Sequence, residues 1–375
     1  MVKNCYDIVV PPLVYNTKNW RIMKIAVYSI AKNEENFVER WYNSAKDADY
    51  LFILDTGSSD NTVQIAENLG INVQSRVIVP WRFDTARNVA LNFLPLDIDY
   101  CIALDMDEVL VPGWRDHIEK LDNNLITRPR YKYTWSWKED GSPGLQYAGD
   151  KIHSRLWYYW KHPVHEVIFC VGTETQGWCD LEIHHFPDHT KSRGQYFPLL
   201  ELAVKEDPTD DRNSHYLARE YFFNKMYDEA AKEFKRHLSL EKSQWKPERA
   251  ASMRYLSKCE PENREKWLWD SVEEASERRE GWVELAKYYY EEQKWMRCYY
   301  CALAALKIKE KPLDYICDEF AWGPAADDYA AISSYNLGFI YYAIYHGKKA
   351  VDMNPDDPRL NSNLSFYISA LENIS

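Results

Sequence analysis

The sequence predicts two units, an α/β domain with a mostly parallel sheet followed by an all-α domain of helical repeats. Short apolar runs alternate with amphipathic helical patterns in the first part of the chain, which is typical of strands joined by crossover helices. After about Pro198 the pattern is helical throughout, and parts of it recur. A chain of 375 residues is long enough for two domains with their own cores.

The α/β unit is predicted from the order of its apolar runs. We expect strands over residues 24–29, 50–55, 72–79 and 100–104, and helices over residues 34–46, 62–69 and 86–93. Gly70 closes the second helix, as a helix stop signal should. Strands separated by helices of this length form right-handed crossovers, so most of the sheet should be parallel. Ligands of such sheets bind at the carboxyl ends of the strands.

Residues 130–185 are rich in aromatic side chains and are interrupted by glycine and proline. We expect a small antiparallel part here, with one longer loop. Core packing accounts for most of its tryptophans. One or two are left to stack on an acceptor, because aromatic faces stack on sugars and on bases. The tryptophans in question are Trp135, Trp137, Trp157 and Trp160.

The helical part repeats at an interval of 68 residues. Residues 216–230 (YLAREYFFNKMYDEA) align with residues 284–298 (ELAKYYYEEQKWMRC), so that Leu217 matches Leu285. This interval is twice the 34-residue period of tetratricopeptide repeats. A weaker unit lies between the two, and a further one, residues 335–360, follows an irregular linker. The alternative is an unrelated helical bundle, but the agreeing intervals favour repeats.

These patterns place an N-terminal extension at residues 1–22, the α/β domain at 23–200 and the repeat domain at 205–375. The repeat domain contains the one Cys-x-x-Cys pair of the chain, Cys298 and Cys301. No second pair completes a zinc site, and the pair lies in a predicted helix. We therefore expect these thiols to be buried structural groups.

The composition argues against several function classes. The 46 Lys and Arg residues against 58 Asp and Glu residues give a net charge of −12, so a broad basic surface for nucleic acid or anionic lipid is not expected. No apolar run approaches the roughly 18 residues of a membrane span, and the N-terminus lacks a signal-peptide pattern. We expect a cytoplasmic protein without a membrane span.

Three polar clusters follow predicted strands: Asn33-Glu34-Glu35, the segment from Asp55 to Asp60, and Asp105-Met106-Asp107-Glu108. The last has the form of a divalent-cation site, because Mg²⁺ and Mn²⁺ prefer carboxylate oxygens and keep positions open for phosphate oxygens. Regular strand alternation would send Asp105 and Asp107 to opposite faces, so the strand must end at Leu104 and turn. The alternative is a solvated acidic loop.

Four segments, in this order, resemble the inverting nucleotide-sugar glycosyltransferases of the family-two group, which have the GT-A fold: SIAKNEENFVERW, LDTGSSDNTVQIAENLGI, FDTARNVAL and IALDMDEVL. The chain looks closest to the bacterial and phage branch, whose catalytic domain is followed by tetratricopeptide repeats. The resemblance implies a GT-A-like domain that uses Mn²⁺ or Mg²⁺ and a UDP-sugar donor.

The same resemblance assigns residues to the donor. It implies that Ala31 and Glu34 lie at the nucleoside end, that Asp55 is the partner of the uracil, and that Asp105 and Asp107 form the diphosphate–metal motif. Arg87 suits a phosphate or a sugar hydroxyl, although pairing with a surface carboxylate is the alternative. The segment FDTARN departs from the expected order at its start, which leaves the role of Asp84 open.

Inverting transfer needs a carboxylate that removes the acceptor proton. Glu166, in the segment HPVHEVI, occupies the place where the related enzymes have their base, and Asp180 is the reserve. His165 is the candidate third metal ligand, with His184 and His185 as rivals. A histidine and a glutamate that merely cap a hairpin are the alternative.

The sequence thus predicts a metal-dependent, inverting glycosyltransferase with a nucleotide-sugar donor. Its acceptor is not identified; a saccharide, a peptide side chain and a modified DNA base are all compatible, although the negative net charge counts against DNA. The repeat domain is expected to bind acceptor, a second copy or a protein partner. Two other classes stay open: an inactive transferase-like scaffold, and a nucleotidyltransferase, which usually has a Gly- and Lys/Arg-rich first loop unlike Ala31-Lys32-Asn33-Glu34.

Overall fold

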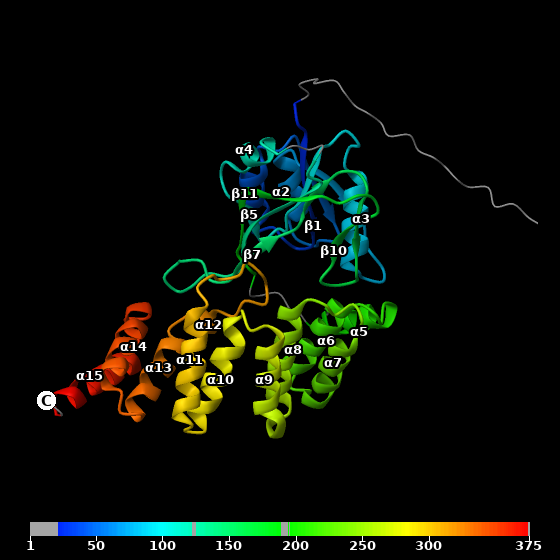
Figure 1. Ribbon diagram of the computed structural model, residues 1–375. Helices are drawn as coiled ribbons and strands as arrows, with labels where there is room; N and C mark the ends of the chain where they lie inside the picture. Colours follow the sequence, from blue (N-terminus) through cyan, green and yellow to red (C-terminus); the bar gives the residue numbers. More distant parts are fainter. Residues whose placement is uncertain (1–21, 122–124, 189–193, 195, 374–375) are drawn as a thin grey trace, which may run out of the picture.

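The computed structural model describes residues 22–121, 125–188, 194 and 196–373. An α/β domain is followed by a row of helices that starts at α5 (Tyr196–Glu206) and ends at α15 (Pro358–Glu372) (Figure 1). This architecture confirms the predicted fold class, a mostly parallel α/β domain followed by an all-α repeat domain. Nearly all of the predicted N-terminal extension lies outside the described residues.

The main sheet has the strand order β3-β2-β1-β4-β8. Its strands are β1 (Ile25–Ala31), β2 (Tyr50–Asp55), β3 (Asn72–Ser75), β4 (Tyr100–Ala103) and β8 (Ile152–Ser154). The first four are parallel, and β8 pairs antiparallel with β4. Side-chain alternation along β1 sends Ile25 and Val27 into one core cluster and Ala26 and Tyr28 into another. The central strand is therefore buried on both faces, which is why it reads as a continuous apolar run.

Helices cover both faces of this sheet. On one face, α1 (Val38–Ala45) and α2 (Thr62–Asn68) contribute Trp41 and Ala66 to the first cluster. On the other face, α3 (Phe83–Phe93) contributes Ala86 and Ala90 to the second cluster. The short helix α4 (Trp114–Glu119) adds the buried Trp114 to the first cluster. The result is a three-layer arrangement, with helices on both faces of the sheet.

Several predicted elements have different bounds; the first helix, for example, begins at Val38 rather than at residue 34. The third strand ends at Ser75 rather than at Val79, because it is an edge strand and most of the residues that follow it are exposed. Ile78 is the exception and packs against the second core cluster. The third helix starts at Phe83 rather than at Ala86. Asp84 explains the earlier start, since its carboxylate accepts a hydrogen bond from the Thr85 amide in the first turn.

A second sheet has the order β5-β11-β6-β7. Its strands are β5 (Glu108–Leu110), β11 (Gln176–His185), β6 (Arg128–Thr134) and β7 (Gln146–Gly149). The prediction of a purely antiparallel part is wrong in one respect, because β11 runs parallel to β6. The chain first crosses over through the hairpin of β9 (Tyr158–Lys161) and β10 (Val167–Cys170) before it returns.

The repeat domain consists of helices that pack mainly with their neighbours in the chain. The helices are α6 (Asp211–Phe223), α7 (Tyr227–Ser239), α8 (Lys246–Cys259), α9 (Arg264–Glu274), α10 (Arg279–Glu291), α11 (Trp295–Lys307), α12 (Glu319–Trp322), α13 (Ala325–Asn336), α14 (Ile340–Met353) and α15. Leu217 on α6 and Leu285 on α10 are both buried, as their aligned positions require. Cys298 and Cys301 are buried free thiols on α11.

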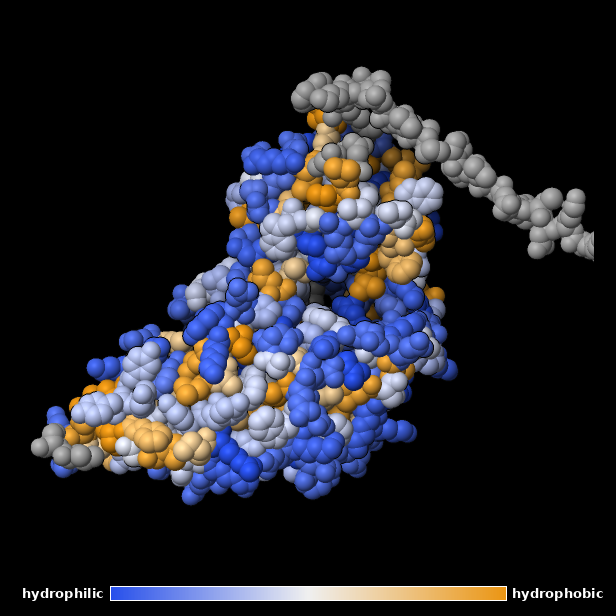
Figure 2. All heavy atoms as spheres, in the orientation of Figure 1, coloured by the Kyte–Doolittle hydropathy of each residue, from blue (hydrophilic) through white to orange (hydrophobic). Residues whose placement is uncertain are grey.

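The two domains are joined by polar and aromatic contacts. Arg82 forms an ion pair with Glu206 at 2.5 Å. The buried Asn213 side chain donates to Nδ1 of His162 at 2.9 Å. On the face shown in Figure 2, hydrophilic side chains cover much of the repeat domain, and the surface is hollowed where the two domains meet. Among the helices that the structure describes, none has the length and hydrophobicity that a membrane-spanning segment needs.

Candidate active site

The nucleoside-binding candidates lie together at the carboxyl edge of β1 and β2. Ala31 is the register partner of Asp55. The buried carboxylate of Asp55 accepts hydrogen bonds from the amides of Gly57 at 3.3 Å and Ser58 at 3.0 Å. Glu34 is also buried, and its amide donates to Thr62 Oγ1 at 2.7 Å. The fold therefore brings Ala31, Glu34 and Asp55 to one edge, and the loops that carry them are fixed by hydrogen bonds.

Asp105 lies just beyond β4, where the chain leaves the sheet. β4 ends at Ala103, and the amide of Glu108 donates to the carbonyl of Asp105 at 2.9 Å, which makes the turn that the sequence analysis required. The Asp105 carboxylate pairs with Arg87 at 2.7 Å and with Lys151 at 2.6 Å. Burial alone would raise the pKa of Asp105, but these two cations outweigh burial and hold the pKa well below its ordinary value.

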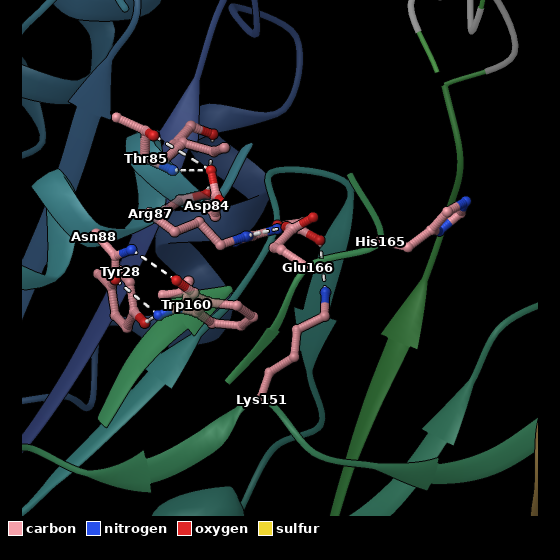
Figure 3. Close-up of polar contacts among 12 residues, drawn as sticks. Tyr28, Asp84, Thr85, Arg87, Asn88, Lys151, Trp160, His165 and Glu166 are labelled. Atoms are coloured by element: carbon pink, nitrogen blue, oxygen red, sulfur yellow. Dashed lines mark hydrogen bonds and ion pairs between the residues drawn. The ribbon is translucent and has the colours of Figure 1, made fainter. Parts of the chain in front are cut away.

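Arg87 joins the two halves of the site. It projects from α3, and its guanidinium pairs with Glu166 (Figure 3). The same guanidinium pairs with Asp105. The Trp160 ring lies under the guanidinium, with the Arg87 Cζ atom 4.9 Å from the ring centroid. The Arg87 side chain is only 6% exposed, yet its Nη1 has no hydrogen-bond partner in the described part of the chain. A buried donor of this kind suits an anionic or hydroxyl-bearing ligand.

Trp160 is held in turn by Asn88 and Tyr28. The Asn88 amide group donates to the Trp160 carbonyl at 2.8 Å and accepts from the Trp160 backbone amide at 2.7 Å. The indole N–H of Trp160 donates to the Tyr28 hydroxyl at 2.8 Å. These contacts, also visible in Figure 3, fix β9 against α3 and β1. Asn88 and Trp160 thus position Arg87 without contributing charge.

Asp107 lies beside His185, the last residue of β11. The Nε2 atom of His185 is 3.2 Å from Oδ2 of Asp107, and its Nδ1 is 2.9 Å from the Trp135 carbonyl. Burial alone would lower the pKa of His185, but the hydrogen bond with Asp107 outweighs burial and raises it. A histidine whose Nδ1 is held by a carbonyl offers its Nε2 to a cation, as metal-binding histidines commonly do. Asp107 and His185 therefore fit a divalent metal ion.

His165 was the histidine expected beside Asp107, and it does not lie there. Its side chain points away from Glu166 and Lys151 in Figure 3 and stacks on Tyr216 of α6, with ring centroids 4.2 Å apart. The other rival, His184, contacts Glu182 at 3.2 Å. The reserve base Asp180 is exposed on β11 and accepts a hydrogen bond from the Trp178 indole at 2.9 Å. The contacts described for Asp180 do not bring it to Arg87 or Asp105.

Lys151 and Glu108 complete the site. The sequence analysis included Glu108 in the acidic cluster without a role of its own and gave Lys151 no role. Lys151 Nζ bridges Asp105 and Glu108, each at 2.6 Å. Glu108 is fully buried; it accepts from the Tyr133 hydroxyl at 2.6 Å and from the Asp105 amide at 2.8 Å. Burial raises the pKa of Glu108, opposed by Lys151. Glu108 could have been identified from its position next to Asp105 and Asp107 in the sequence. No neighbouring sequence feature points to Lys151.

Comparisons with known proteins found similarity to glycosyltransferases over part of the chain. Residues 27–171 match the family model described as glycosyl transferase family 2. A protein named as an uncharacterized glycosyltransferase of Rickettsia conorii is 37% identical over 97 residues, covering 26% of this chain and 33% of the relative. The chain thus spans about a third of the length of that curated relative.

Two solved structures are similar to parts of this chain. The glucosyl-3-phosphoglycerate synthase of Mycobacterium tuberculosis, solved with Mn²⁺, UDP and glucosyl-3-phosphoglycerate, is 25% identical with a TM-score of 0.25 and covers 30% of this chain and 44% of that chain. A thermophilic TPR protein of Thermus thermophilus is 16% identical with a TM-score of 0.32 and covers 46% of this chain and 88% of that chain.

Proposed function

We propose that this chain, whose residues 27–171 form a glycosyltransferase family 2 domain, transfers a sugar from a UDP-sugar to an acceptor hydroxyl with inversion at the anomeric carbon. One observation carries the proposal: Arg87 holds Asp105 and Glu166 in a single site at the carboxyl edge of the sheet. A repeat domain of tetratricopeptide type follows. We infer that it presents the acceptor or a protein partner to this site.

The donor is proposed to lie across the carboxyl ends of β1, β2 and β4. Asp55 would pair with the uracil, with Ala31 and Glu34 at the nucleoside, because these residues share the sheet edge and are buried there. The unpartnered Nη1 of Arg87 supports a contact with a phosphate or sugar oxygen. Asp105 has both carboxylate oxygens in ion pairs, so we assign it to the positioning of Arg87 and Lys151.

Asp107 and His185 are the proposed holders of Mn²⁺ or Mg²⁺. A bound divalent ion supplies positive charge against the negative charge of a departing diphosphate. The two residues suit it because one carboxylate and one oriented imidazole already face each other. Asp105 has no unpaired carboxylate oxygen to offer the ion, because one oxygen pairs with Arg87 and the other with Lys151. We therefore propose that it assists by holding these two cations near the metal site.

Glu166 is the proposed base. Its carboxylate is 9% exposed and paired with Arg87, which keeps an anionic group close to the donor site. In the transfer, the acceptor oxygen forms a bond to the anomeric carbon while the bond from that carbon to the phosphate oxygen breaks. The acceptor proton passes to the Glu166 carboxylate, and UDP leaves. The acceptor is proposed as a hydroxyl of a saccharide, a peptide side chain or a modified DNA base.

The test is hydrolysis of a panel of nucleotide sugars, measured with and without Mn²⁺. Asp107→Asn should abolish metal-dependent turnover and the rise in melting temperature that UDP with Mn²⁺ gives, because a ligand of the folded state stabilises it. Glu166→Gln should lower turnover by roughly 10²- to 10⁴-fold while leaving that rise in place.

Asp180→Asn is the matched control, since it makes the same change at the reserve base. Full activity of Glu166→Gln combined with loss in Asp180→Asn would transfer the role of base to Asp180. No turnover with any nucleotide sugar and no thermal shift with UDP and Mn²⁺ would leave only a scaffold.

A further inference from the structure

We propose that Asp211, His237 and Glu248 form a divalent metal site in the repeat domain, separate from the candidate active site, and that Zn²⁺ is the ion its donors suit best. The three side chains come from three consecutive helices, α6, α7 and α8. One potential ligand atom from each lies within 4.8 Å of the other two. Such a spacing allows a single ion to reach all three with small side-chain movements.

The charge of this cluster favours a cation. His237 is fully buried, Glu248 is nearly so, and Asp211 is half-buried. His237 Nε2 lies 3.3 Å from a Glu248 oxygen. In the part of the chain that the structure describes, neither Asp211 nor Glu248 forms an ion pair with a lysine or arginine. Two carboxylates against one imidazole leave negative charge that a divalent ion would offset.

A second set of residues, one helical turn away, orients the imidazole. Ser252 Oγ lies 2.9 Å from Nδ1 of His237 and 2.8 Å from Nδ1 of His215. Asp211 and His215 are four residues apart on α6, and Glu248 and Ser252 are four apart on α8, so each pair shares a helix face. Because Ser252 holds Nδ1, the Nε2 of His237 is the atom that faces the carboxylates. Outer partners of this kind are typical of metal-binding histidines.

The remaining contacts are compatible with an ion. Ser243 Oγ lies 3.1 Å from His237 Nε2, a contact that an ion at Nε2 would replace. The Tyr315 hydroxyl donates to the other oxygen of Glu248 and so fixes that carboxylate. One imidazole nitrogen with two carboxylates suits Zn²⁺, which accepts three protein ligands plus a water, better than it suits oxygen-only ions such as Ca²⁺. The partial exposure of Asp211 gives the ion a route from solvent.

The position of the site gives it a structural role. An ion there would tie α6, α7 and α8 together and hold Tyr315, which lies in the segment before α12. The Tyr315 ring stacks on Tyr216 with centroids 5.9 Å apart, and Tyr216 stacks on His165. The site therefore lies at the base of an aromatic column that supports the loop of Glu166.

The experiment removes the candidate active-site metal first. We would purify the full chain as Asp107→Asn/His185→Gln, dialyse it against a chelator, add Zn²⁺ and measure bound zinc by mass spectrometry after gel filtration. One equivalent of zinc and a rise in melting temperature are expected. Adding His237→Gln should abolish both. His346→Gln is the matched control, because His346 is also buried and paired with an aspartate, Asp327 at 2.7 Å, outside the cluster.

Ser252→Ala should keep all three ligands and weaken zinc affinity roughly 10- to 100-fold, which is the usual effect of losing an outer partner. If circular dichroism shows that His237→Gln does not fold, the zinc affinity of Ser252→Ala tests the site instead. Failure of the double variant to bind zinc, or zinc binding that His237→Gln and Ser252→Ala leave unchanged, would overturn the site. Because enzymatic turnover does not enter, these outcomes are independent of the proposed transferase activity.

Discussion

At the scale of single residues, the candidate active site is a set of charges whose partners come from distant parts of the chain. The sequence was sufficient to select Arg87, Asp105 and Glu166, and the structure brings these three together. It did not distinguish His185 from His165, because the choice depends on β11 returning beside β5, where His185 is the register partner of Glu108. The role of Lys151 could not be predicted for the same reason. Lys151 precedes β8, and the sequence does not indicate that β8 pairs with β4.

A buried histidine of the α/β domain makes stability depend on pH. His153 donates through Nδ1 to the Ser154 carbonyl at 2.8 Å, and its Nε2 accepts from the Tyr28 hydroxyl at 3.1 Å. Burial lowers the pKa of His153 to about 4. The unfolded chain, with a histidine pKa of about 6.5, therefore binds a proton between these values that the folded chain does not. The stabilisation is complete above about pH 6.5 and is lost as the pH falls toward 4, by ~3 kcal/mol in total.

Denaturant unfolding at pH 7 and at pH 4.5 measures this effect. His153→Gln should show a smaller drop in unfolding free energy between the two pH values than the unmodified chain, although it is less stable at pH 7. The same substitution at the partly exposed His117 is the control and should leave the drop unchanged. An equal drop in His153→Gln would show that other groups carry the pH dependence.

At the scale of secondary-structure elements, the sequence located most helices and strands, and the misassigned bounds have local causes. Buried β1, β2 and β4 are apolar runs and were found easily, whereas the edge strand β3 ends early because most of its side chains and of those that follow are exposed. The parallel pairing of β11 with β6 is a matter of topology, and alternation of side chains does not reveal which strand a strand pairs with.

The pairing of β6 with β7 depends on a glycine. Tyr131 and Gly149 are register partners, and a Cβ atom at position 149 would lie 2.3 Å from Tyr131 Cε2. Tyr131 is fully buried, and close packing in protein interiors resists displacement of its ring. Gly149→Ala should therefore destabilise the chain by about 1–3 kcal/mol through overpacking. Because Lys151 is two residues on, the variant should also weaken UDP binding.

Thermal and denaturant unfolding of Gly149→Ala provide the measurement. Gly172→Ala is the matched control in the same domain, because a Cβ there meets Trp157 at an ordinary 3.5 Å. A similar loss of stability in both variants would mean that the contact with Tyr131 is not the cause.

At the scale of the whole molecule, the repeat domain reaches the loop that carries Glu166. Arg212 of α6 donates to the His165 carbonyl at 3.1 Å, and Tyr216 stacks on the His165 ring with an interplanar angle of 16°. His165 adopts a left-handed backbone conformation, with φ of 48°, which is uncommon for a residue with a side chain. We therefore expect the repeat domain to fix the position of Glu166, the proposed base.

Tyr216→Ala tests this dependence. It should lower turnover of the nucleotide sugar by roughly tenfold or more, because small misplacements of a reacting group are costly, while UDP binding stays unchanged. Tyr341→Ala on α14, where the side chain is 76% exposed, is the control. Circular dichroism would check that the repeat domain of Tyr216→Ala is folded. Unchanged turnover in the folded variant would show that the α/β domain alone positions Glu166.

The hydrogen bond from Arg212 to the His165 carbonyl oxygen has a consequence for evolution. A carbonyl is present whatever amino acid occupies position 165, so mutations there alter the ring contact but leave the anchoring hydrogen bond available. Substitutions at position 165 therefore preserve this hydrogen bond between the domains, whereas substitutions of Arg212 remove it. Selection that preserves this hydrogen bond should accordingly act on Arg212 more than on the side chain at position 165.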